Sequence, residues 1–256
     1  IDTIESVINQ TYKNIEYIFI DGKSTDNTIS IIKSFGDKIS TLISEKDNGL
    51  YDALNKGIAI ATGDVIGILH SDDFYTNTNV IQNIVSVFDK TNADAVYADL
   101  YYVDKNNTNQ IHRKWKSGNY KYGMFLNGWM PPHPTFFVKA ECYKKFGNFN
   151  LQFKSAADYE LMLRFIHKQK ISLGYLRLIH KHKIKLAYLP EFIIKMRVGG
   201  KSNITFKNRI RANKEDRLAW KLNNVKPYFY TLYLKPLRKI IQLFRRWFYN
   251  SISVLK

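Results

Sequence analysis

Acidic side chains follow two strand-like segments in the first third of the chain. Asp21 comes directly after the β-branched and aromatic run 16–20, and Asp72 and Asp73 follow a second such run, 65–69, after two further residues. Ligands of open α/β sheets bind beyond the carboxyl ends of strands, so we expect both sets of acids to face one crevice. Neighbouring carboxylates there suit a divalent cation such as Mg²⁺ or Mn²⁺ that also holds a diphosphate. The alternative, that the second pair only caps a helix, is less favoured because Asp21 ends a second strand.

A second pair of acids and one histidine are further candidates. Asp158 and Glu160 open a predicted helix, where the helix dipole favours acids, so capping accounts for them as well as chemistry does. In the functional interpretation one of these carboxylates lies over the crevice as a general base. Spacing alone does not distinguish this interpretation from capping. His133 lies between two prolines that fix its backbone, which favours a functional role, although a lone histidine is more often a packed or surface residue.

Several common nucleotide-binding and nucleophile motifs are missing from the sequence. Gly22-Lys23-Ser24 matches the end of a P-loop, but Tyr17 occupies the position of the earlier glycine. No Gly-x-Gly-x-x-Gly run follows a predicted strand, and no Gly-x-Ser-x-Gly run occurs. The sequence therefore gives no support to a P-loop ATPase, a dinucleotide-dependent oxidoreductase or a serine hydrolase of the elbow type.

The charge of the chain is unevenly distributed. Its 256 residues include 39 Lys and Arg against 22 Asp and Glu, a formal net charge of +17, but the acids end at Asp216 while basic residues continue to Lys256. Such basicity fits nucleic acid, an anionic membrane or phosphorylated ligands. A nucleic-acid-binding protein is disfavoured, because the predicted crevice carries carboxylates that repel phosphates unless a metal is bound. The single cysteine, Cys142, excludes a disulfide scaffold, and no run approaches the roughly 18 apolar residues of a membrane span.

Hydrophobic periodicity indicates the elements that must position these residues. Strands alternate with helices through the first hundred residues, which predicts an α/β fold with a parallel-type sheet. A loop rich in proline surrounds residues 128–134, and a helix follows from Asp158 to His167. The other predicted strands are 42–43, 95–97, 188–190 and 192–194, and the other predicted helices are 52–61 and 80–88.

Taken together, these segments resemble the family 2 glycosyltransferases with the GT-A fold, especially the bacterial branch found in exopolysaccharide, capsule and O-antigen synthesis. The resemblance covers roughly residues 4–225, with every motif in the correct order. The motifs that carry it are 6–12 with 20–28 (the nucleotide-binding opening), 44–57 (the second signature), Ser71-Asp72-Asp73 (similar to the Asp-x-Asp metal motif), 128–137, Ala157-Asp158-Tyr159-Glu160 and 196–202.

The resemblance implies an inverting transfer of a sugar from a nucleotide-sugar to an acceptor hydroxyl. It places Asp21 at the nucleobase, Asp47 at the nucleotide and Asp72 at the ribose side of the donor. It makes Asp73 the ligand of a Mn²⁺ or Mg²⁺ ion that bridges the diphosphate, and Asp158 the general base that deprotonates the acceptor.

Four more residues are expected to bind the donor by the same resemblance. Ser24 and Lys56 belong to the first and second signatures, His133 would assist the metal or the diphosphate, and Lys201 lies in a mobile loop near the donor. A non-catalytic member of the family is the alternative, and the acids at the five positions named above argue against it.

The ends of the chain depart from the family pattern. The family starts with a strand that is central in its sheet, and this sequence begins after it, so we expect a GT-A domain over residues 1–225 that is truncated at its N-terminus and has an open slot in the sheet. The segment 171–184 is longer and more basic than the corresponding family connection.

Residues 226–256 form a predicted basic helical tail. From Leu237 its apolar residues fall at helical spacing among arginines and lysines, a pattern typical of helices that lie on anionic lipid. We therefore expect a cytoplasmic protein, peripheral on the inner face of the cytoplasmic membrane, with a lipid-linked saccharide as acceptor and no nucleic-acid partner. Packing of the tail on the catalytic domain is the alternative.

Overall fold

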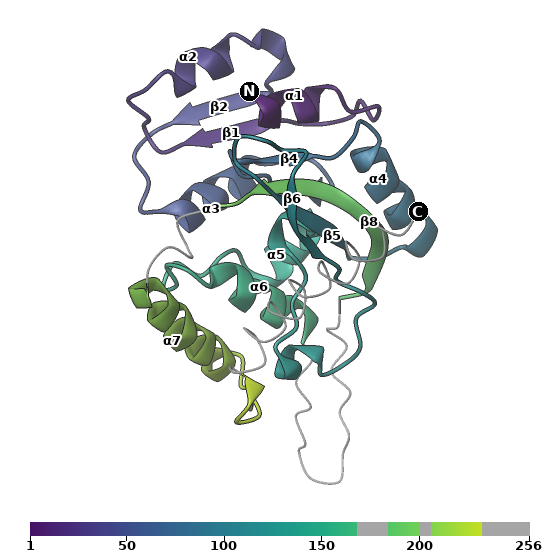
Figure 1. Ribbon diagram of the computed structural model, residues 1–256, viewed down its shortest axis with the longest axis vertical. Coiled ribbons are helices and arrows are strands. Elements are labelled where there is room, and N and C mark those ends of the chain that lie inside the picture. Colours follow the sequence, from purple (N-terminus) through teal and green to yellow (C-terminus); the bar gives the residue numbers. More distant parts are fainter. Residues whose placement is uncertain (168–183, 200–205, 232–256) are drawn as a thin grey trace, which may run out of the picture.

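The computed structural model describes residues 1–167, 184–199 and 206–231, and its helices and strands alternate along most of the chain (Figure 1). In chain order the elements are α1 (Asp2–Ile8), β1 (Ile18–Asp21), α2 (Thr28–Lys33), β2 (Thr41–Ser44), α3 (Leu50–Ile60), β3 (Val65–Ile66), β4 (Asp73–Tyr75), α4 (Val80–Thr91), β5 (Ala95–Val103), β6 (Ile111–Trp115), β7 (Phe137–Lys139), α5 (Ala140–Phe146), α6 (Ala157–Ile166), β8 (Leu186–Arg197) and α7 (Phe206–Leu222). Short 3₁₀ turns occupy 36–38, 124–127 and 133–135.

The strands form two sheets. β1 and β2 make a parallel pair, and the larger sheet has the order β3-β7-β5-β8-β4, with β6 paired to β5. Within the larger sheet β5 and β8 are parallel and the other pairs are antiparallel. The expected parallel-type sheet is therefore mixed, because β6 and β7 return beside β5 as antiparallel neighbours instead of through helical crossovers.

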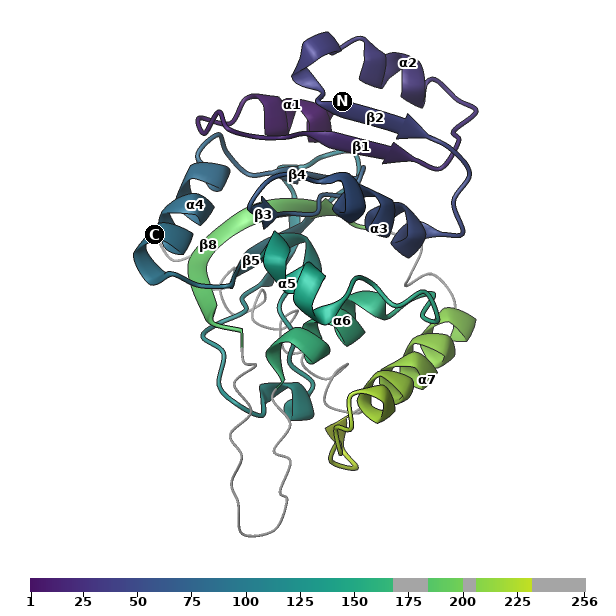
Figure 2. The same cartoon turned by 180° about the vertical axis from the view of Figure 1, so that it is seen from behind.

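Helix α1, which precedes the small sheet in the chain, is joined by two hydrogen bonds to the segment 71–75 that contains β4. The hydroxyl of Thr3 donates to the carbonyl of Ser71, and the backbone N–H of Tyr75 donates to the Ser6 hydroxyl. Among the described strands β1 pairs with β2 alone. Figure 2 shows α1, α2, β1 and β2 together at one end of the molecule, with α3 running beside β1.

Strand β8 is longer than expected. The sequence predicted two short strands, 188–190 and 192–194, separated around Pro190, but β8 runs without a break from Leu186 to Arg197. Its pairing with β5 steps from Tyr188 opposite Tyr97 to Phe192 opposite Asp99. This irregularity accommodates the proline, which has no N–H to donate to a ladder.

Strand β3 is shorter than expected. The sequence predicted a strand over 65–69, but β3 ends at Ile66, and Asp73 begins β4 instead of following a strand end. A Cβ atom at Gly67 would lie 2.4 Å from the ring of Phe137, so the chain passes too close to β7 for any larger residue there.

Two hydrophobic clusters fill the space around the large sheet. One packs α4 against β5 and β8, and the fully buried Val80 and Ile84 form the centre of the α4 face. The other lies around α5 and α6 and includes Phe125 and Trp129. The indole N–H of Trp129 donates to the carbonyl of Ser117, so the proline-rich loop is fixed to the sheet as an ordered structure.

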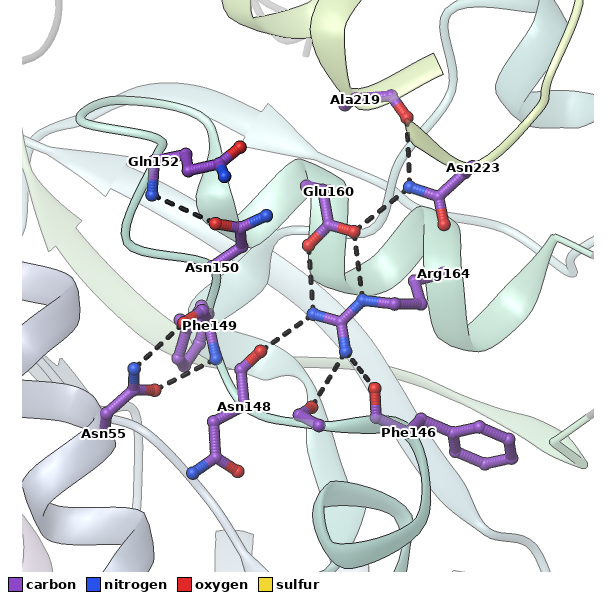
Figure 3. Close-up of polar contacts among 11 residues, drawn as sticks. Asn55, Phe146, Asn148, Phe149, Asn150, Gln152, Glu160, Arg164, Ala219 and Asn223 are labelled. Carbon is purple, nitrogen blue, oxygen red and sulfur yellow. Dashed lines mark hydrogen bonds and ion pairs between the residues drawn. The ribbon is translucent and has the colours of Figure 1, made fainter. Parts of the chain in front are cut away.

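Helix α7 lies beside α6 and fixes its N-terminal end. The carboxylate of Glu215 accepts hydrogen bonds from the backbone N–H groups of Lys154, Ser155 and Ala156, just before α6 begins. Asn223, which follows α7, donates to Glu160 in the first turn of α6, as Figure 3 shows. The position of α6 therefore depends on the chain that follows β8.

Candidate active site

Asp21 sits at the carboxyl end of β1 in a set of donors. Its carboxylate accepts from the backbone N–H of Ser24 at 2.9 Å, from the Ser24 hydroxyl, and from the Ser44 hydroxyl at 2.7 Å. Burial raises the pKa of Asp21, but these hydrogen bonds outweigh it and hold the pKa below its usual value. The structure therefore brings Asp21 and Ser24 together as one anionic, hydrogen-bonded group.

Asp47 lies against the turn that follows Asp21. A Cβ atom at Gly22 would be 2.6 Å from the Asp47 carboxylate, so this approach requires glycine. The carboxylate also accepts from the backbone N–H of Gly49 at 2.8 Å, just before α3 begins. Asp47 and Asp21 thus border the same turn, and the binding of a nucleotide by these two residues stays a prediction.

The side chain of Lys56, on helix α3, holds the loop that contains Asp47 against this helix. Its ammonium lies 2.7 Å from Glu45 and 3.8 Å from Asp52, and it donates to the carbonyl of Lys46. The hydrogen bond to Glu45 raises the pKa of Lys56, which stays charged. In this structure Lys56 supports the loop, and donor binding by Lys56 remains a prediction.

Asp72 and Asp73 differ sharply in exposure. Asp72 is exposed, and its carbonyl accepts from Arg197 of β8 at 3.0 Å. Asp73 is only 1% exposed, and its Oδ2 has no hydrogen-bond partner among the described residues. Burial, with a smaller contribution from Asp72, raises the pKa of Asp73 to about 7.

The acids fit a divalent cation whose remaining ligands come from substrate and water. Among the described residues no group of three histidine, cysteine or acidic side chains could enclose a metal ion. The orphaned oxygen of Asp73 and the exposed carboxylate of Asp72 nevertheless supply hard anionic donors on adjacent residues. Mg²⁺ is commonly held by one or two carboxylates together with substrate phosphates and waters, and this donor set has that composition.

Asp158 is partly exposed in the first turn of α6, and side chains from two other elements contact it. The hydroxyl of Tyr51 on α3 donates to its Oδ1 at 3.2 Å, and Nδ1 of His133 lies 3.4 Å from its Oδ2. Nε2 of His133 is in turn 2.7 Å from Nε2 of His70, three residues before Asp73. The structure therefore connects the predicted base to the segment that carries the predicted metal ligand.

The structure also separates the roles of Asp158 and Glu160. Glu160 is 3% exposed and forms a two-pronged ion pair with Arg164, whose guanidinium also donates to the carbonyls of Phe146, Gly147 and Asn148 (Figure 3). Both oxygens of Glu160 are occupied, so it serves packing between α6 and the loop after α5. Of Asp158 and Glu160, Asp158 is the one whose carboxylate reaches the surface.

Sequence reasoning did not find all of these residues. His70, Tyr51 and Arg197 were not predicted as site residues, although Tyr51 lies inside the 44–57 signature and His70 lies next to the 71–73 motif. Lys201, which was predicted to bind the donor, lies outside the described residues.

Comparisons with known proteins agree with this architecture. The model of "Glycosyl transferase family 2" matches residues 1–146, and the chain belongs to that family. An uncharacterized glycosyltransferase of Mycobacterium tuberculosis is 31% identical over 164 residues, 63% of this chain and 62% of that protein. The glycosyltransferase GlyG of Streptococcus pneumoniae is 33% identical over 112 residues, 43% of this chain and 37% of that protein. The chain thus spans less than two thirds of the length of these relatives.

Solved structures show the same fold. TarS of S. aureus in complex with UDP-GlcNAc superimposes with a TM-score of 0.60 at 14% identity, covering 91% of this chain and 64% of that one. The mannosyltransferase PcManGT of Pyrobaculum calidifontis in complex with GDP-Man and Mn²⁺ gives a TM-score of 0.58 at 16% identity, with the same coverage. The mixed sheet with its flanking helices is a GT-A fold, as the sequence predicted. None of the helices in the described part of the chain is long and apolar enough to cross a membrane.

Proposed function

We propose that this chain is an inverting, metal-dependent glycosyltransferase that moves a sugar from a nucleotide-sugar to an acceptor hydroxyl. The contact between His70 and His133 is the main support, because it brings the segment of Asp72 and Asp73 next to Asp158. A donor-holding group and an accessible base on the two sides of one site are what in-line displacement at a sugar carbon requires. The similarity to the glycosyltransferase GlyG and the UDP-GlcNAc and GDP-Man complexes of the structural neighbours also support the proposal.

In this proposal each cluster has a separate task. Asp21 and Asp47 bind the nucleoside through the turn at Gly22, with Ser24 orienting Asp21. Asp72 contacts the ribose side of the donor, and Asp73 holds a Mn²⁺ or Mg²⁺ ion. When bound, that ion neutralises charge on the departing nucleoside diphosphate. Asp158 accepts the proton of the acceptor hydroxyl as the oxygen attacks the sugar.

The experiment that tests the activity is a screen of UDP- and GDP-sugars for hydrolysis and transfer with and without Mn²⁺. For the best donor, Asp158→Asn should lower kcat by roughly a hundredfold while donor affinity stays within about twofold, because a general base typically contributes about that factor. Asp89→Asn, at an exposed acid of α4, is the matched control and should leave kcat unchanged. Full activity of Asp158→Asn would move the base to another residue, and no turnover of any donor by the native chain would refute the activity.

We further propose a peripheral position on an anionic membrane surface, with a lipid-linked saccharide as acceptor and cell-surface polysaccharide synthesis as the role. Support comes from the exposed side of α7, where Arg211, Lys214, Arg217 and Lys221 recur at helical spacing. Phe229 follows this stripe and is 90% exposed. Aromatic and basic side chains together favour the interface of an anionic bilayer.

A further inference from the structure

Two side chains from two separate elements contact the carboxylate of Asp158. Tyr51 reaches Oδ1 from α3, and His133 reaches Oδ2 from the 3₁₀ turn 133–135. His70 lies behind His133, and their Nε2 atoms are 2.7 Å apart. The four residues therefore form one array that runs Tyr51–Asp158–His133–His70.

The geometry dictates where the protons of this array lie. Two ring nitrogens at 2.7 Å need one proton between them, so either His70 or His133 donates from Nε2. If His133 were the donor, its Nδ1 would present a lone pair to the Asp158 carboxylate 3.4 Å away, which is repulsive. The favourable arrangement is that His70 donates from Nε2 and that His133 carries its single proton on Nδ1, toward Asp158.

The charge state of the His133 ring agrees with this arrangement. Burial lowers the pKa of His133 to about 4, so this ring carries a single proton at neutral pH. Burial also raises the pKa of Tyr51, so its hydroxyl keeps the proton that it donates to Asp158.

The framework around the array is rigid. His133 lies between two prolines, and the next residues are held to the sheet because the buried Thr135 hydroxyl donates to the carbonyl of Ala98. The ring of Tyr51 stacks on Phe149 with centroids 5.5 Å apart, and Asn55 exchanges two hydrogen bonds with the backbone of Phe149 (Figure 3). Side chains whose own positions are fixed in this way can orient a third group.

We propose that Tyr51 and His133 are positioning residues that fix the Asp158 carboxylate on both oxygens, and that His70 selects the tautomer of His133 required for this. The inference rests on the proposed function in one respect, namely that Asp158 is the base. A carboxylate held from both sides by fixed side chains keeps one direction toward the acceptor hydroxyl. This assigns His133 to the base instead of to the metal or the diphosphate.

The tautomer is tested directly on the native chain without any ligand. In a long-range ¹H–¹⁵N correlation spectrum of the six histidines, assigned with His70→Phe and His133→Phe, the His133 ring should give the Nδ1–H pattern. In His70→Phe the Nε2 atom of His133 loses its donor while Asp158 still favours a proton on Nδ1, so the His133 signal should shift partway toward the Nε2–H pattern, the intrinsically favoured neutral form. An Nε2–H pattern for His133 in the native chain, or no change in His70→Phe, would overturn the proposal.

Kinetics on the best donor test the effect on the base. His133→Leu and Tyr51→Phe should each lower kcat by about tenfold to a hundredfold with KM for the donor within about twofold, because a base displaced by about 1 Å loses that much rate. His133→Asn, whose amide can donate from the position of Nδ1, should recover kcat to within about threefold of native. Equal losses in the Asn and Leu variants, or a rise in donor KM at unchanged kcat, would show that His133 does not act through Asp158.

A matched control is present elsewhere in the chain. His112 pairs with Asp104 at 3.3 Å on the β5–β6 hairpin, so His112→Asn makes the same exchange in a second histidine–aspartate pair and should leave kcat unchanged. The two proposals fail separately. If the native chain turns over no nucleotide-sugar, the proposed activity fails while the spectrum still decides the arrangement of His70, His133 and Asp158.

Discussion

Asp73 is the residue where burial and function conflict most plainly. A carboxylate that is 1% exposed with an orphaned oxygen loses hydration without gaining a partner, which costs free energy in the absence of a cation. Arg197, which bonds to the backbone of its neighbour Asp72 and to the side chain of Asp2, supplies only partial compensation. Such an uncompensated group is expected where a protein reserves a site for a ligand.

The first prediction concerns this carboxylate. Asp73→Asn should weaken binding of UDP or GDP in the presence of Mn²⁺ by at least about tenfold, because one anionic ligand is lost beside a diphosphate. Without metal, the two proteins should bind the nucleotide equally. Calorimetry with and without Mn²⁺ measures both quantities. Unchanged affinity of the variant in Mn²⁺ would show that Asp73 does not hold the ion, and Asp72→Asn would then be the next variant to measure.

A second prediction at this scale uses the lowered pKa of Asp21. Its folded-state pKa lies below the unfolded value, so its hydrogen bonds with Ser24 and Ser44 contribute stability above the unfolded pKa, and that contribution is lost as pH falls through the folded pKa. Asp21→Asn should lower the free energy of unfolding at pH 7 by about 1–3 kcal/mol, the range for hydrogen bonds to a charged group. Urea unfolding at pH 7 and near pH 3 should show the difference shrinking at the lower pH. A difference that is equal at both values would contradict the assignment.

At the scale of elements, side chains of α7 hold the start of α6 in place, although the two helices are far apart in sequence. Helix α6 has alanine at its N-cap, which has no side chain to cap the helix, and Glu215 of α7 receives the preceding N–H groups instead. The indole of Trp220 also donates to the hydroxyl of Tyr159, next to Asp158. The segment that carries the predicted base is therefore held from outside by α7.

This arrangement gives the third prediction. Glu215→Ala should lower the free energy of unfolding by about 1–3 kcal/mol, because buried N–H groups lose their acceptor, and Glu215→Gln should restore part of it. Glu215→Ala should also lower kcat for transfer from the best donor, because the segment that carries Asp158 loses this support. Glu141→Ala, at an exposed acid in the first turn of α5, is the control that should change neither. Urea titrations provide the stability difference, and an unaltered midpoint in Glu215→Ala would refute the capping role.

The elements also show where sequence reasoning succeeds. Hydrophobic periodicity predicted the helices α3, α4 and α6, because the apolar face of a helix is set by residues within one or two turns of each other. The His70–His133 contact joins residues 63 apart in sequence, and the close approach of Gly67 to the ring of Phe137 joins the chain after β3 to β7. The register of β8 likewise depends on pairing with β5 around Pro190. Such features are tertiary, so no local pattern reports them.

For the molecule as a whole, the described chain beyond α7 turns back onto the domain within the first residues of the predicted tail, 226–231. Val225 is buried and donates its N–H to the carbonyl of Trp220, and the hydroxyl of the buried Thr231 donates to the carbonyl of Leu126. The predicted amphipathic helix from Leu237 lies outside the described residues, and the boundary at residue 226 stays a prediction. Phe229, in the same stretch as Thr231, is 90% exposed, and it follows the basic side chains of α7 in the chain.

The last prediction tests the basic face of α7, formed by Arg211, Lys214, Arg217 and Lys221, as a membrane contact. The native chain should sediment with anionic phospholipid vesicles at low salt and detach at high salt, because screened charges lose their attraction to the surface. Lys214→Gln with Lys221→Gln should lower the partition coefficient by roughly thirtyfold, since each basic residue near anionic lipid contributes about 1 kcal/mol. Lys33→Gln with Lys90→Gln removes the same charge from exposed positions on α2 and α4 and should have little effect. Equal losses in the two pairs would mean that net charge alone drives binding, and the α7 face would then not be the membrane contact.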